Sequence, residues 1–210
     1  MTSQRDIMQL QPAECMPMID EIQDGSLRSL VEDMWLDMFS WSGWDDVRSC
    51  PFVKLAAAEV YSLTQHSNNV AIVAASIGVT LAERRDPPVR PDIDLLIAGS
   101  ILHDVSKLVE TTMVDGKVET SALGWNAPHA SASLASLARR GASPVLLNIV
   151  AAHTPATNAS IRSYEASIVG HADYIDGDGF ASLHKMPYFS QIARKGASAL
   201  GRAVSGLPKQ

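Results

Sequence analysis

A histidine and an aspartate, His103 and Asp104, stand side by side near the end of an apolar run from Ile93 to Val109. If this run is helical, adjacent positions lie about 100° apart, so the imidazole and the carboxylate can face one bound cation. Lys107 follows on the same face, where its ammonium group can hold an anionic substrate group over the metal. A His-Asp pair alone is more often a hydrogen-bonded core pair than a metal site. The metal-site interpretation therefore needs further ligands elsewhere in the sequence.

Other histidines and a second aspartate recur at positions that would carry them into the same interior. His66 belongs to an apolar stripe at helical spacing, and His153 ends another such stripe. We expect His129 at the start of a helix that Asn126 caps, and Asp173 on the inner face of a later helix, where a buried carboxylate needs a partner. The candidate metal ligands are therefore His66, His103, Asp104, His129, His153 and Asp173.

The number and type of these ligands predict the chemistry of the site. Neutral imidazoles and carboxylates suit iron, manganese, zinc or cobalt, and six ligands exceed what one closed four-ligand site uses. We therefore expect two divalent transition-metal ions, with iron the first choice, and Asp104 as the bridge between them. The other ligands then divide into His66, His103 and Asp173 for one ion and His129 and His153 for the other.

Such a pair of ions supports hydrolysis. Metals roughly 3.5–4 Å apart share a water whose pKa falls from 15.7 toward about 7, and they also clamp a phosphoryl oxygen. Asp104 would be catalytic as the bridge. Lys107 would be catalytic and substrate-binding, because its charge opposes the charge that builds on the phosphoryl group.

Composition excludes several other classes of protein. The chain has 210 residues, enough for one domain with a sizeable core, and its only cysteines, Cys15 and Cys50, form no C-x-x-C motif. The net charge of −6 argues against broad nucleic-acid or anionic-membrane binding. No stretch reaches the roughly 18 apolar residues that span a bilayer. We expect a cytoplasmic protein that binds a small phosphorylated molecule; a homodimer is a possible assembly.

The hydrophobic pattern predicts a mainly α chain with one small β-hairpin. The hairpin, with an Asp-Gly turn, is predicted for residues 111–120, as an insertion near the mouth of the site. Ser26, Asp92 and Ser163 are expected to cap helices. The other expectations are an arm over residues 1–24, a helix from Val53 to about Arg84, a loop over residues 176–179 and a last helix from Tyr188 to Val204.

Several short motifs resemble a known family. They are His66-Ser67 with Val70-Ala71, Ile101-Leu102-His103-Asp104-x-x-Lys107, His129, Ala152-His153-Thr154 and His171-Ala172-Asp173-Tyr174-Ile175-Asp176. This series resembles the HD-domain superfamily of metal-dependent phosphohydrolases. It is most similar to the bacterial HD hydrolases that cleave diadenosine tetraphosphate symmetrically.

The resemblance implies an HD-domain helical bundle, the metal assignment given above, and cleavage of a phosphate ester or anhydride, for example of a nucleotide, by a metal-bound hydroxide. We divide the chain into an N-terminal arm and helix that pack on the core (1–52), the HD domain (53–180) and a C-terminal helix of the same domain (181–210). Pro155-Ala156 replaces the glycine and arginine that the family has after its His-Thr pair. Arg162 is the nearest basic residue, so we expect it to bind substrate.

Two alternatives to a hydrolase remain. Myo-inositol oxygenase and the phosphonate-cleaving HD oxygenases resemble the ligand pattern equally, hold two irons and activate dioxygen. An HD-type di-iron oxygenase acting on a small polyol or phosphonate is therefore the alternative function. The short run from His153 to Asp173 favours the hydrolase. A non-catalytic signalling module of HD type would be expected to have lost ligands, and all six are present.

Overall fold

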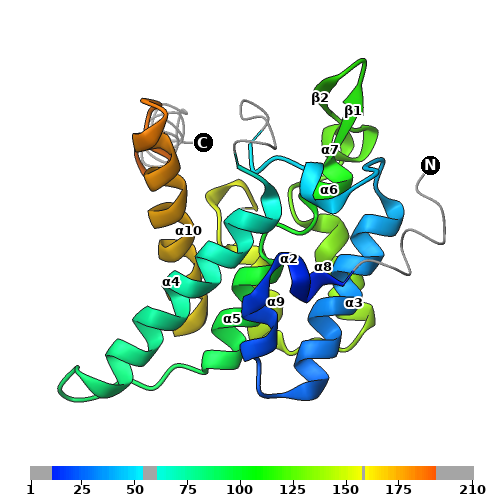
Figure 1. Ribbon diagram of the computed structural model, residues 1–210. Coiled ribbons are helices and arrows are strands. Elements are labelled where there is room, and N and C mark those ends of the chain that lie inside the picture. The colour runs from blue at the N-terminus through cyan, green and yellow to red at the C-terminus, as the bar shows by residue number, and fades with distance from the viewer. Residues whose placement is uncertain (1–10, 54–60, 158, 193–210) are drawn as a thin grey trace, which may run out of the picture.

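The central element of the fold is α5 (Ile93–Leu102), and its burial follows from its sequence. A helix that is apolar on all sides must be surrounded by protein, and residues 96–102 of α5 are all buried. The computed structural model describes residues 11–53, 61–157 and 159–192. In it, α5 contacts three long helices and one shorter one (Figure 1). These are α3 (Gly25–Trp41), α4 (Leu63–Glu83), α10 (Tyr164–Leu183) and α9 (Pro144–Ala152).

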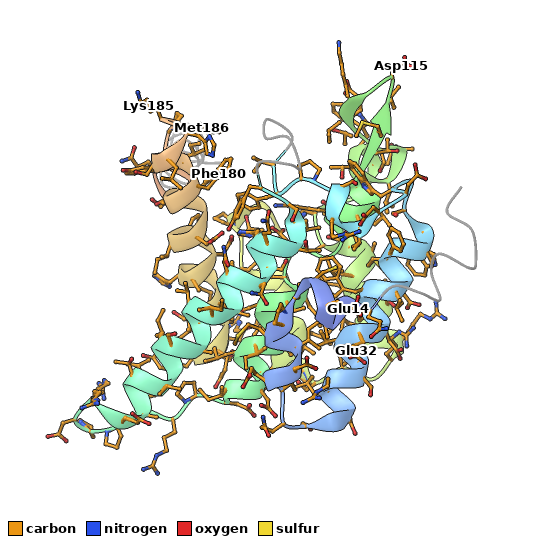
Figure 2. The ribbon with its side chains drawn as sticks, viewed as in Figure 1. Glu14, Glu32, Asp115, Phe180, Lys185 and Met186 are labelled. Carbon is orange, nitrogen blue, oxygen red and sulfur yellow. The ribbon has the colours of Figure 1, made fainter. Side chains whose placement is uncertain are left out.

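Short helices and a β-hairpin complete the fold. Strands β1 (Thr111–Val114) and β2 (Lys117–Thr120) pair antiparallel and project above α6 (Lys107–Glu110) and α7 (Ala122–Asn126) (Figure 1). Asp115 and Gly116 both have positive φ, as a two-residue hairpin turn of this kind requires, and Figure 2 shows Asp115 at the tip. The mainly α fold with a small hairpin is confirmed. The other elements are α2 (Pro12–Cys15), η1 (Pro17–Glu21), η2 (Val47–Ser49), α6 (Lys107–Glu110), α7 (Ala122–Asn126), α8 (Ser131–Arg139) and η3 (Pro155–Thr157).

Two of the four predicted helix caps are correct; Asn126 does not cap a helix but is the last residue of α7. The Asp92 carboxylate accepts a hydrogen bond from the N–H of Leu95, and the Ser163 hydroxyl accepts one from the N–H of Ala166. The cap of α3 is Asp24 and not Ser26, because the Asp24 carboxylate accepts from the N–H groups of Ser26 and Leu27. An aspartate that accepts two of the orphan N–H groups of a helix start stabilises that start more than a serine inside the first turn does.

The described part of the predicted N-terminal arm, residues 11–24, packs on the core. In residues 11–24, Met16, Ile19 and Ile22 are fully buried in the main core. The Asp94 carboxylate of α5 accepts hydrogen bonds from the backbone N–H groups of Gln23 and Asp24. The segment turns through a four-residue helix and a 3₁₀ helix, which are too short to show a hydrophobic period.

Three other boundaries differ from the predictions. The helix expected from Val53 begins at Leu63, where Ser62 and Gln65 form a capping box, while residues 54–60 lie outside the described residues. The helix expected at His129 begins only at Ser131. Residues 176–179 are not a loop but part of α10, and Phe189 packs so closely on Gly177 that a Cβ there would lie 3.1 Å from its ring.

The predicted last helix is described only at its start. Residues 189–192 are helical, and the rest of the predicted range Tyr188 to Val204 lies outside the described residues. The division into 1–52, 53–180 and 181–210 stays a prediction. Within the described ranges, no helix is long and apolar enough to cross a lipid bilayer.

Burial of residues 11–24 predicts a large effect of truncating Ile19. Ile19→Ala removes fully buried methyl groups and should lower the free energy of unfolding by about 2–5 kcal/mol. Urea denaturation followed by circular dichroism measures this change. Glu21→Ala, in the same segment but with an exposed side chain, is the control and should stay within about 0.5 kcal/mol of the parent. Equal stability of the two variants would show that the segment is a dispensable arm.

Candidate metal centre

The six predicted ligands meet at one end of the bundle, although five different segments of the chain carry them. His66 lies in the first turns of α4, and His153 is the C-cap of α9. His103 is the C-cap of α5, and Asp104 follows it in the turn before α6. Asp173 lies in the middle of α10, and His129 lies in the connector between α7 and α8.

Four of these residues form the first ligand group: His66, His103, Asp104 and Asp173. Their candidate ligand atoms lie within 4.8 Å of one another. The Nε2 atom of His66 is 3.2 Å from Oδ1 of Asp173 and 3.2 Å from Nε2 of His103. Side chains of His66 and His103 are fully buried, so this group is enclosed by the protein.

Asp104, His129 and His153 form the second ligand group, and Asp104 belongs to both. Its Oδ1 atom is 3.1 Å from Nε2 of His129 and 3.6 Å from Nε2 of His153. Its Oδ2 atom is 3.3 Å from Nε2 of His103 and 3.6 Å from Nε2 of His66. Each oxygen of the carboxylate therefore faces one group, which is the geometry that a bridging ligand needs.

The Nδ1 atoms of the four histidines determine which ring nitrogen carries the proton. His103 Nδ1 lies 2.6 Å from the carbonyl oxygen of Ser100, and His153 Nδ1 lies 2.8 Å from that of Val150. A carbonyl oxygen only accepts, so Nδ1 must be the protonated atom of both rings. In the neutral ring the Nε2 atom then carries a lone pair that points into the site.

The other two histidines are fixed in the same way by carboxylates. His66 Nδ1 donates to Asp176 and His129 Nδ1 donates to Glu110, each over 2.7 Å. As a result the Nε2 atoms of His66 and His103 face each other over 3.2 Å, and those of His129 and His153 over 3.3 Å. Two lone pairs at this distance repel each other unless a cation or a proton lies between them. This donor set fits divalent metal ions, each held by imidazole nitrogens and carboxylate oxygens.

The charges of the site shift the pKa values of its groups when no ion is bound. Burial raises the pKa of the Asp104 carboxyl, but Lys107 and His103 outweigh it and hold that pKa well below its usual range. Burial lowers the pKa of His129, whereas Asp104 and Glu110 raise it to about 9. For His153 burial dominates and lowers the pKa, which keeps this ring neutral, as a metal ligand must be.

The two predicted substrate-binding residues lie in different surroundings. Lys107 Nζ is 2.6 Å from Oδ2 of Asp104, and it donates to the carbonyl oxygen of Phe52 over 3.1 Å, so its charge lies at the edge of the site. Arg162 is exposed, and it precedes α10. The helix rise puts Tyr164, where α10 begins, about 14 Å from Asp173 along the axis. Arg162 therefore has to reach farther than Lys107 to contact a substrate bound at the ligand groups.

Sequence reasoning missed Glu110 and Asp176, which orient two of the histidines. The sequence pattern predicts a loop at Asp176, whereas in a helix Asp176 lies one turn after Asp173, on the same face. Glu110 had no sequence signal, because His129 lies nineteen positions later in the chain, beyond the hairpin. Tyr61 was also missed; its hydroxyl donates to Asp176 over 2.5 Å.

The bridging geometry predicts how the metal content depends on Asp104. Asp104→Ala removes an oxygen from both groups, so purified variant protein should lose both ions, whereas His129→Ala should lose only one. Elemental analysis of dialysed protein, with circular dichroism to confirm folding, measures this. Asp45→Ala, which removes an exposed carboxylate, is the matched control. An Asp104→Ala variant that retains its full metal content would remove this residue from the bridging position.

The family of the chain follows from comparison with known proteins. The family model described as the HD domain matches residues 63–178, more than half of the chain, from the start of α4 to α10. The matched range contains all six residues of the two ligand groups. Searches of curated proteins and of solved structures found no match, so the particular similarity to diadenosine tetraphosphate hydrolases stays a prediction. The chain belongs to the HD-domain family, which consists mainly of metal-dependent hydrolases.

Proposed function

We propose that the protein is a dinuclear metal-dependent phosphohydrolase that cleaves a phosphate ester or anhydride of a small molecule such as a nucleotide. The observation that carries the proposal is the position of Asp104, whose Oδ1 faces His129 and His153 and whose Oδ2 faces His66 and His103. A carboxylate that faces two ligand groups in this way would hold two ions, one in each group. Two such ions, when bound, supply a nucleophilic water at neutral pH and polarise the phosphoryl group.

The protein orients the metal-binding side chains and excludes water from one side of the site. Each imidazole is held by its Nδ1 atom, so the Nε2 lone pairs are already directed when substrate arrives. Phe52 stacks on His66, with ring centroids 3.7 Å apart, and covers that side of the site. Preorganised ligands of this kind cost no reorganisation during the reaction.

We further propose that Lys107 contacts the phosphoryl group of the substrate. Among the described residues, Asp104 and the carbonyl of Phe52 take two of its three N–H donors, which leaves one for a substrate oxygen. Burial lowers the pKa of Lys107, but Asp104 outweighs burial and raises it, so the side chain carries its charge at neutral pH. A fixed positive charge at this place stabilises the negative charge that develops on the transferred group.

The source of the oxygen in the product distinguishes hydrolysis from oxygenation. A screen of nucleotides, phosphate esters and phosphonates in an anaerobic chamber should find turnover, with ¹⁸O from labelled water in the product phosphate, because hydrolysis needs no oxidant. Mass spectrometry of the phosphate measures the label. A substrate whose turnover stops without dioxygen, and whose new oxygen comes from the gas, would replace the hydrolase with the di-iron oxygenase.

The position of Lys107 predicts separate effects on metal binding and on turnover. Lys107→Met keeps the aliphatic stem but removes the charge, so kcat should fall about 10²–10³-fold, as on losing one transition-state donor. Elemental analysis should show the same metal content as the parent protein. Lys117→Met, in the exposed part of the hairpin, is the matched control and should keep parental turnover. A Lys107→Met enzyme with parental kcat would contradict the assigned contact.

A further inference from the structure

Of the four histidines of the two ligand groups, His129 is the one that neither lies in a helix nor is the C-cap of one. The other three lie in a helix or at its C-cap, whereas His129 lies in the connector that joins α7 to α8. The next residue, Ala130, has φ of 64°, in the left-handed region that residues with a side chain rarely adopt. The His129 side chain is also 18% exposed, against 2% for His153. Its position therefore depends on contacts from outside its own segment.

Those contacts converge on one carboxylate, that of Glu110. Its Oε2 atom accepts from Nδ1 of His129 over 2.7 Å, and its Oε1 atom accepts from the backbone N–H of Ala130 over 3.0 Å. The hydroxyl of Ser106 donates to Oε1 over 2.7 Å and fixes the carboxylate in turn. Glu110 therefore holds both the imidazole and the strained backbone beside it.

The backbone of Glu110 is anchored as well, at the base of the hairpin. Glu110 is the last residue of α6, and its carbonyl oxygen accepts from the N–H of Ser121, where the chain returns from β2. A Cβ on Gly124 would come within 2.3 Å of that oxygen, so α7 packs directly against it. This anchoring leaves the carboxylate little freedom to move away from His129.

We propose that Glu110 is a positioning residue that sets the affinity of the second metal position, formed by Asp104, His129 and His153. It does so without touching the ion, by keeping the proton of His129 on Nδ1 and the Nε2 lone pair turned inward. A carboxylate that accepts from the other ring nitrogen of a metal-binding histidine contributes about 10–100-fold in metal affinity. The proposal rests on the two-ion centre of the proposed function.

The first metal position, formed by His66, His103, Asp104 and Asp173, does not depend on Glu110. It has four candidate ligands, against three for the second, and its His66 is held by Asp176, 2.7 Å away. Asp176 lies on α10, near Tyr61 and Phe180, whose rings stack; Figure 2 shows Phe180 on that helix. Each position therefore has its own carboxylate, so a change at Glu110 should weaken one position and leave the other unchanged.

The test is titration of metal-free protein with Co²⁺, followed by visible absorption and by calorimetry. We expect two binding phases in the parent protein. In Glu110→Gln the Kd of one phase should rise at least tenfold and the other should stay unchanged. His129 and Ala130 donate to different oxygens of Glu110, and in glutamine one of these oxygens is replaced by an NH₂ group, which cannot accept. Glu119→Gln makes the same charge change at an exposed position of the hairpin and should bind like the parent. Asp176→Asn should weaken the other phase.

Other outcomes overturn the proposal. If Glu110→Gln lowers only the melting temperature of the metal-free protein and leaves both Kd values unchanged, Glu110 is a structural residue. Equal weakening of both phases would show that it serves the whole site and not one position. If Glu110→Gln does not fold, Glu110→Asp, which keeps the charge but withdraws the carboxylate, must show the same selective rise in Kd.

The Co²⁺ titration tests the role of Glu110 independently of the proposed hydrolase function. The titration uses metal alone, so it does not depend on whether a substrate has been found. Selective loss of one binding phase together with dioxygen-dependent turnover would support the proposed role of Glu110 and contradict the proposed hydrolase function. A parent protein that binds only one Co²⁺ ion would overturn the two-ion centre and both proposals.

Discussion

Unshared electron pairs of several buried side chains lie close together and repel one another at one end of the bundle. Four imidazole Nε2 atoms and the oxygens of Asp104 and Asp173 point into the same space, with Nε2 atoms only 3.2 and 3.3 Å apart. A protein tolerates such an arrangement when cations compensate it. The surrounding elements can be understood as the means of holding these groups in place against that repulsion.

The C-terminal ends of two helices hold two of the four histidines in place. His103 and His153 are the C-caps of α5 and α9, and each donates its Nδ1 proton to the carbonyl three residues earlier. The last carbonyl groups of a helix have no partner in the helix, so the imidazole satisfies one of them and is oriented by it. The partial negative charge at both C-termini also favours cations at the site. The same contact at a helix C-terminus therefore orients one histidine in each ligand group.

The apolar core fixes where those helix ends lie. Because α5 is buried on all sides, its C-terminus cannot shift without moving α3, α4, α9 and α10 with it. The indole N–H of Trp35 on α3 donates to the carbonyl of Ile101, next to the site. Residues 11–24 add Ile19 and Ile22 to the same core, so a segment without a ligand still helps to hold α5. Positions of the ligands are therefore a property of the whole bundle.

Residue types and spacing predicted the six candidate ligands, which lie in two groups that share Asp104, and they predicted the mainly α fold and the hairpin. Residue type and helical period are local signals, and they suffice for side chains that helices such as α4 and α10 carry. Packing of the whole chain was needed to pair Glu110 with His129 and Asp176 with His66, and to select which residues of the segment 11–24 are buried. These contacts join residues that are far apart in the chain or lie in turns without a period. The physical reason is that local sequence specifies which face a side chain takes, whereas packing of the whole chain specifies which group it meets there.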